Sequence, residues 1–262
     1  FLNLFCLILV NVLFVRLAEY GTDRGGQVLL LVGVLILLLL INDKSKSSNL
    51  IKEDFIKFFL IIGALILSLK PFYLIYAPLI FSFLIFPNLK TNFIAVIKSS
   101  TFLLVLIYSF FSFFYTFINS SCIIFPLNFT CFENLSWSIP KNEINDVKIW
   151  YELWSKAGAT PNLIVENRLD YTENFNWVPN WIEYYFFNKV SDFLLSILFI
   201  LVIVFLIFKD KKRKNFSNRN YLLIYFYLLF CLIEWFFNHP SLRYGGYHLF
   251  FLLLFIPLAF QF

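Results

Sequence analysis

The chain has 262 residues, of which 60% are apolar and only 14% charged, and its mean hydropathy is +0.78. A soluble domain carries roughly a quarter charged residues, so this composition excludes an ordinary soluble protein and predicts an integral membrane protein. The apolar runs have the length of helices, which predicts an all-α fold, a polytopic bundle of transmembrane helices. We interpret the chain as a fragment of a longer protein, because it begins and ends within apolar runs and contains no methionine.

The apolar runs predict about eight membrane spans. A single helix over 55–86 would be ~48 Å long, well beyond a hydrocarbon core of ~30 Å. We therefore expect a short hairpin at Lys70-Pro71, with a tip recessed on the outer side and Lys70 in a cavity; the alternative is one long kinked helix. The expected spans are 1–15, 27–41, 55–69, 72–86, 93–118, 190–208, 220–237 and 248–262.

Charge predicts which side of the membrane each loop faces. Residues 209–219 carry six Lys and Arg but one acid, so by the positive-inside rule this loop is cytoplasmic. Alternation of the spans then places the loops 16–26, 119–189 and 238–247 on the outer side. We divide the chain into three parts, namely helices 1 to 5 over 1–118, an extracytoplasmic loop over 119–189, and helices 6 to 8 over 190–262.

The large loop contains a predicted amphipathic helix over 146–158, which Gly158 would end. Two interpretations stay open, a helix that lies on the bilayer through an aromatic belt and a lid over a membrane-embedded site. The helix face consists of Val147, Trp150, Tyr151, Trp154 and Ala157, and a second aromatic group of Trp177, Trp181, Tyr184 and Tyr185 precedes the sixth span.

Two of the four cysteines flank a short segment of the same loop. Cys122 and Cys131 favour a disulfide, which would require an oxidising compartment, although two unpaired thiols are the alternative. Cys6 and Cys231 lie in apolar runs and are expected to be packing residues.

Five of the eight glycines fall in two polar strings that mix glycine with ionisable residues. The first, RLAEYGTDRGG over 16–26, contains Glu19, Asp23 and Arg24 at the start of the second span. One interpretation is a helix cap with local ion pairs. The other is an anion site made by the helix N-terminus, the glycine amides and Arg24, with Glu19 or Asp23 as a general base.

The second string, NHPSLRYGGY over 238–247, has a similar pair of interpretations. It is either a tight turn with polar residues in headgroup water, or a site in which Arg243 binds a phosphate and His239 transfers a proton. Glu234, just inside the seventh span, is an auxiliary candidate, because an acid within the membrane is costly to keep.

The sequence contains no motif for a known cofactor. It has no Walker loop, Rossmann glycine pattern, Ser-His-Asp order or CxxC pattern, and its two histidines do not predict a metal site. The cofactor stays unknown: no haem, flavin or nucleotide is indicated, and a divalent cation on the acids is compatible with the pattern. The expected partners are the lipid bilayer and a lipid-linked sugar or glycan, not nucleic acid.

The two glycine strings resemble those of an uncharacterised family of bacterial multi-pass inner-membrane proteins, catalogued by a domain of unknown function. In layout this family is similar to the C-fold glycosyltransferases, which use polyprenyl-phosphate-linked sugars at a periplasmic site. The resemblance implies location in the bacterial inner membrane. The histidines and arginines that O-antigen ligases use in their large loop have few counterparts in 119–189, which contains no histidine and one arginine, Arg168.

Together these observations predict a membrane-embedded glycosyltransferase-like or surface-polysaccharide assembly protein at the periplasmic face. Glu19 or Asp23 would be the base, and Arg24, Arg243 and Lys70 would bind the phosphate of the donor. The alternatives are a transporter or flippase of lipid-linked oligosaccharide and a non-catalytic membrane scaffold.

Overall fold

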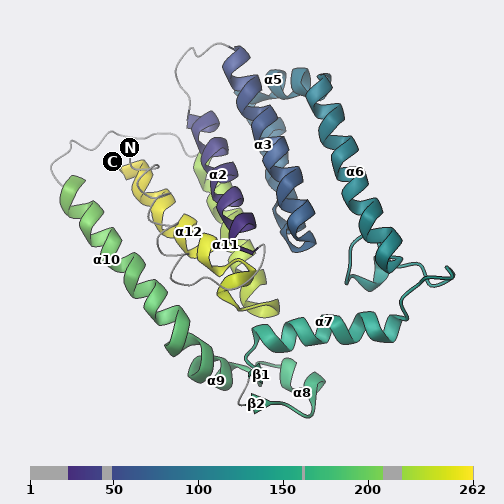
Figure 1. Cartoon of the computed structure of the whole chain (residues 1–262). Helices are drawn as coiled ribbons and strands as arrows, with labels where there is room; N and C mark the ends of the chain where they lie inside the picture. The colour runs from purple at the N-terminus through teal and green to yellow at the C-terminus, as the bar shows by residue number, and fades with distance from the viewer. Residues whose placement is uncertain (1–22, 43–48, 161–162, 209–219, 262) are drawn as a thin grey trace. The chain divides into compact units, whose positions relative to one another are not determined.

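The computed structural model describes residues 23–42, 49–160, 163–208 and 220–261. This part of the chain is almost entirely helical, with one two-stranded sheet (Figure 1). The elements are α2 (Asp23–Asn42), α3 (Asn49–Leu69), η1 (Pro71–Phe81), α4 (Ser82–Ile85), α5 (Pro87–Ile97), α6 (Ser100–Ser120), η2 (Asn128–Thr130), α7 (Lys141–Ser155), β1 (Ala159–Thr160), β2 (Leu163–Ile164), α8 (Arg168–Thr172), α9 (Val178–Trp181), η3 (Ile182–Val190), α10 (Ser191–Phe208), α11 (Asn220–Asn238), η4 (Leu242–Tyr244) and α12 (Gly246–Gln261).

Several of these helices have the length and composition of membrane spans. Within the described ranges, four are long and apolar enough to cross a membrane: Asp23–Ile41, Ser100–Ser120, Val178–Leu206 and Tyr221–Asn238. A fifth candidate is the broken pair of Pro71–Ile85 and Pro87–Ile97, whose two halves are bent by 111°. Prolines explain the break, because Pro87 opens α5 while Phe86 before it is extended.

The chain forms two compact units, the first consisting of residues 1–115 and 216–231. In this unit α2 packs along α3, with Gly33 of α2 facing Phe59 and Ile62 of α3 (Figure 1). The core continues to α4 and α5 through edge-on contact of Phe59 with Phe83, whose ring centroids lie 5.1 Å apart. The unit therefore holds the start of α2 next to the end of α3.

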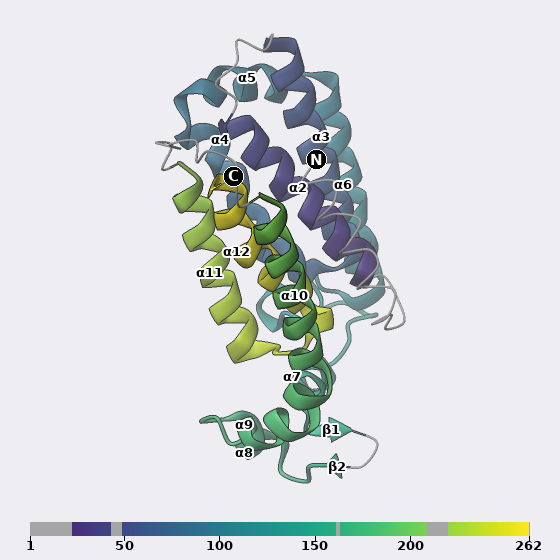
Figure 2. The ribbon, with the colours of Figure 1, turned by 90° about the vertical axis from the view of Figure 1, so that its left-hand side faces the viewer.

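The second unit consists of residues 116–215 and 232–262. Here α7 leads to the antiparallel pair β1 and β2, in which Ala159 lies opposite Ile164, and then to α8 and α9 (Figure 2). The helix from α9 into α10 passes through η3, which is a π-helix. π-Helical turns are rare in proteins, and those that occur are often at functional sites. The π-helical form of η3 therefore marks this aromatic segment as unusual.

Two differences from the sequence expectations concern helix boundaries. The span expected over 93–118 is divided, since α5 ends at Ile97 and α6 begins at Ser100. The amphipathic helix begins at Lys141 and ends at Ser155, before Gly158. The break expected at Lys70 is present, but a 3₁₀ helix follows it. The expected span 1–15 and the basic loop 209–219 lie outside the described residues.

Candidate functional site

Asp23 and Lys70 form an ion pair within the first unit. Asp23 opens α2 and is buried, whereas Lys70 is extended between α3 and η1, with its side chain 24% exposed. The following Pro71 excludes the helical conformation for Lys70, so the chain turns there and carries the ammonium to the start of α2. Removing two charges from water costs several kcal/mol per ion, so such a pair is rarely retained for stability alone.

Gly26 lies in contact with the same pair of helices. A Cβ atom on Gly26 would lie 2.6 Å from Cε2 of Tyr73 in η1, too close for any other residue without rearrangement. The Tyr73 hydroxyl in turn donates a hydrogen bond to the Asp23 carbonyl at 3.4 Å. The glycine thus has a packing role, which allows Tyr73 to cover the start of α2. Arg24 is exposed.

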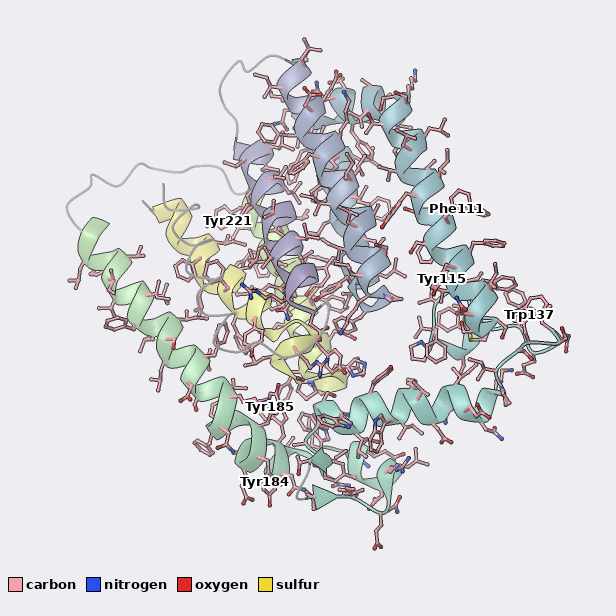
Figure 3. The ribbon with its side chains drawn as sticks, in the orientation of Figure 1. Phe111, Tyr115, Trp137, Tyr184, Tyr185 and Tyr221 are labelled. Carbon is pink, nitrogen blue, oxygen red and sulfur yellow. A yellow bond between two sulfur atoms is a disulfide. The ribbon has the colours of Figure 1, made fainter. Side chains whose placement is uncertain are left out.

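The second glycine string is held by a group of aromatic side chains. The Trp181 indole donates to the Pro240 carbonyl at 2.7 Å, and the Trp235 indole donates to the Ser241 carbonyl at 2.8 Å. Tyr185 lies 2.7 Å from the Ser241 hydroxyl and accepts a hydrogen bond from the Leu242 amide at 3.1 Å. Figure 3 shows Tyr184 and Tyr185 leaving η3 in different directions; Tyr185 is buried, whereas Tyr184 is 39% exposed.

The structure requires glycine at positions 245 and 246 for two different reasons. Gly245 has φ of 134°, a conformation that other residues rarely adopt. A Cβ atom on Gly246 would lie 2.7 Å from Cζ2 of Trp235 and 2.8 Å from Cδ2 of Leu242. The string is therefore a rigid, tightly packed turn that places the side chains of η4.

Two candidate residues, Arg243 and His239, lie near the ring of Tyr244 at this turn. The Arg243 guanidinium lies 5.4 Å from the ring centroid of Tyr244, and the His239 ring centroid lies 5.8 Å from it. Burial lowers the pKa of His239 to about 4, an effect that Glu152 opposes and Lys156 reinforces. His239 is therefore neutral near pH 7, the form that can accept a proton.

Lys156 and Glu152 were missed by sequence reasoning. Lys156 is 3% exposed; its ammonium lies 2.5 Å from Oε1 of Glu152, donates to the Thr172 carbonyl at 3.2 Å, and lies 5.2 Å from the Trp177 ring centroid. The available signal was the spacing of four residues between acid and lysine at the end of a helix. Because the rest of the chain decides their burial, that spacing suggests only a surface pair.

The remaining candidates are placed as follows. Glu234 accepts a hydrogen bond of 3.0 Å from the Asn238 amide within α11. A disulfide joins Cys122 to Cys131, the pairing that the sequence favours. Glu19 lies outside the described residues. Among the residues that are described, no group of three or more His, Cys, Asp or Glu is arranged to hold a metal ion.

The structure thus brings Asp23 and Lys70 together in the first unit, where Arg24 also lies. In the second unit His239 and Arg243 each lie near the ring of Tyr244, and this unit contains Glu234 as well. That the two strings form one site stays a prediction from the sequence.

The fold defines the class as a helical protein with several helices able to span a membrane. Its sequence adds a family assignment: residues 1–251 match the model of the family described as Domain of unknown function (DUF8201), and the chain belongs to that family. No curated protein and no solved structure matches the chain.

Proposed function

We propose that the protein is a membrane-embedded enzyme that transfers a sugar from a lipid-phosphate donor on the periplasmic face of the bacterial inner membrane. The observation that carries the proposal is the ion pair of buried Asp23 with half-buried Lys70 at the start of a candidate span. Ionisable residues at such positions are costly, and they commonly mark substrate or proton pathways. A carboxylate beside an ammonium offers the two groups that transfer to a hydroxyl requires.

In the proposed reaction the acceptor hydroxyl gives its proton to the Asp23 carboxylate. Its oxygen forms a bond to the anomeric carbon of the donor sugar, while the bond between that carbon and the phosphate oxygen breaks. The lipid phosphate leaves with the electron pair, and the Lys70 ammonium stabilises its negative charge. Arrival of the phosphate gives Lys70 a second anion to bind, which lets the Asp23 carboxylate accept the proton.

Arg24 is proposed as a further phosphate ligand in the first unit, and Arg243 as a phosphate ligand in the second, since guanidinium groups bind phosphate through two hydrogen bonds. Glu19 stays an alternative base. His239, neutral near pH 7, is proposed as an auxiliary proton carrier within the second unit.

The test is transfer of labelled sugar from a polyprenyl-phosphate donor by the purified protein in nanodiscs. Asp23→Asn and Lys70→Met should each lower the rate by about 10²–10⁴-fold. The matched controls are Asp54→Asn and Lys57→Met, because this ion pair of 3.0 Å lies on the surface of α3 with the Asp54 side chain 74% exposed. Unchanged transfer in the two Asp23 and Lys70 variants would remove the pair from the mechanism.

One observation favours a second candidate, a transporter or flippase of lipid-linked oligosaccharide. The 111° bend between Pro71–Ile85 and Pro87–Ile97 resembles the discontinuous helices around which transporters build substrate sites. This function predicts movement of a labelled lipid-linked oligosaccharide across a vesicle bilayer without transfer of the sugar. The two functions are distinguished by the unchanged protein, which under this candidate moves the oligosaccharide but forms no transfer product. Lys70→Met would then lower the rate of movement.

A further inference from the structure

The segment that follows Lys70 has an unusual backbone. The helix η1 keeps the 3₁₀ form over 11 residues, Pro71–Phe81. Runs of 3₁₀ helix longer than three or four residues are uncommon, because their hydrogen bonds are poorly aligned, and a longer run often marks strain or a functional segment. Contacts from outside η1 are therefore needed to hold it in this form.

Pro78 leaves one carbonyl of η1 without a donor from the helix itself. In a 3₁₀ helix each N–H donates to the carbonyl three residues earlier, as the Tyr73 amide does to the Lys70 carbonyl at 3.1 Å. The same rule pairs the Ile75 carbonyl with residue 78, which is a proline and has no N–H. A backbone carbonyl within a folded protein needs another partner in such a case.

Tyr227 of α11 supplies the missing donor. Its hydroxyl donates a hydrogen bond to the Ile75 carbonyl, 152 residues away in the sequence but in the same unit. In an α-helix the Ile75 carbonyl would instead accept from the Leu79 amide, and Pro78 would leave the Leu74 carbonyl without a donor. The bond from Tyr227 thus satisfies the carbonyl that only the 3₁₀ form leaves over, so it favours that form.

Both ends of η1 are held in place. After η1, Phe83 of α4 lies in the core, with its ring centroid 5.1 Å from that of Phe59. At the beginning of η1, the Tyr73 hydroxyl donates to the Asp23 carbonyl at 3.4 Å. The length of η1 consequently has to match the distance between these two contacts.

The 3₁₀ form provides that length. A 3₁₀ helix rises ~2.0 Å per residue and an α-helix ~1.5 Å, so over η1 the two forms differ by ~5 Å. Conversion of η1 to an α-helix would therefore draw Lys70 and Tyr73 away from Asp23, or pull Phe83 out of the core. The ion pair of Asp23 and Lys70 depends on the form of η1.

We propose that Tyr227 is a positioning residue for the ion pair of Asp23 and Lys70. By donating to the carbonyl that Pro78 leaves without a partner in the helix, it holds η1 in the form that brings Lys70 to the start of α2. The consequence for catalysis rests on the proposed function, in which the Lys70 ammonium stabilises the departing phosphate.

The first test measures how fast Lys70 is methylated by formaldehyde and cyanoborohydride in nanodiscs, by peptide mass spectrometry. Pairing with Asp23 protects the amine, so Tyr227→Phe, which removes only the hydroxyl, should raise the rate about 5–10-fold. Lys57 is the internal reference, because it pairs with Asp54 on the surface of α3 and should react equally in every variant. The control is Tyr225→Phe on the same helix, where the Tyr225 ring lies beside Phe226 and the rate at Lys70 should stay unchanged.

Pro78→Ala separates this positioning role from a role of Tyr227 in packing. With an N–H at residue 78, the Ile75 carbonyl has a donor from the helix in either form. Tyr227→Phe should then change the methylation rate by less than about twofold relative to Pro78→Ala alone. An equal effect of Tyr227→Phe in the two backgrounds, or none in the unchanged protein, overturns the proposal.

The transfer assay distinguishes failure of the proposed function. Tyr227→Phe should lower kcat more than it changes KM for the donor, because Lys70 acts on charge that develops in the transition state, and Pro78→Ala should abolish this effect too. Methylation needs neither donor nor turnover, so it alone decides the positioning role. A methylation rate that responds as expected, with no transfer or with transfer that ignores these variants, would contradict only the proposed function.

Discussion

The indole of Trp181 donates a hydrogen bond of 2.7 Å to the carbonyl of Pro240, which ties the segment before α10 to the glycine string after α11. Trp181 also lies close to Trp177 and Tyr185, with ring centroids 6.1 and 6.3 Å away. The aromatic group before the sixth span is thus largely a structural clamp on 238–247. Only Tyr184 of the four is exposed as an interfacial anchor would be.

Replacing Trp181 by phenylalanine should lower stability by about 1–3 kcal/mol, because the change keeps a ring but leaves the buried Pro240 carbonyl without this donor. The measurement is the midpoint of denaturant unfolding in detergent, followed by circular dichroism. Trp154→Phe is the control, since Trp154 is 47% exposed and should change stability by less than about 0.5 kcal/mol. Equal midpoints for both variants would contradict the clamp.

Gly246→Ala should destabilise the protein by about 1–3 kcal/mol, because the new methyl group would overlap Trp235 and Leu242. Gly63→Ala provides a matched control in a helix where nothing lies within 4 Å of the added Cβ. That change should be neutral or stabilising, by up to about 1 kcal/mol, because alanine favours a helix. Thermal unfolding midpoints compare the two; a stable Gly246→Ala variant would mean that Trp235 can move aside.

Stability should depend on pH through His239. Its pKa is lowered from 6.5 to about 4 in the folded protein, so between these values the unfolded chain binds more protons. The contribution of neutral His239 to the free energy of unfolding is complete above about pH 6.5. It is lost as the pH falls toward 4, by up to about 1.4 kcal/mol per pH unit. Unfolding of the unchanged protein and of His239→Asn should show a difference that shrinks as the pH is lowered. A difference independent of pH would argue against a neutral His239 in the folded protein.

Lys156→Met should cost about 3 kcal/mol, because it leaves Glu152 without the buried ammonium that neutralises it. The double variant with Glu152→Gln should recover part of this loss, since it removes the unpaired charge. Lys148→Met is the control on an exposed position of the same helix and should change stability by less than about 0.5 kcal/mol. Additive losses in the double variant would show that the two side chains do not interact.

Much of the helical layout could be predicted from the amino-acid pattern. Apolar runs of span length predicted helices at α2, α10, α11 and α12. Pro71 predicted the break in the helix at Lys70. The division of 93–118 was not foreseen, because Lys98 and the serines after it are too short an interruption to be told from a polar helix face. The π-helical form of η3 has no signal in composition at all.

The candidate site shows the same limit more sharply. Composition and spacing were enough to single out Asp23, Lys70, His239 and Arg243, because charge is rare in this chain and glycine-rich strings are few. That Asp23 pairs with Lys70, and that Lys156 is buried beside Trp177, depended on which helices pack together. A local pattern reports how costly a residue is in an apolar segment, whereas the partner that offsets the cost is chosen by contacts between segments distant in the chain.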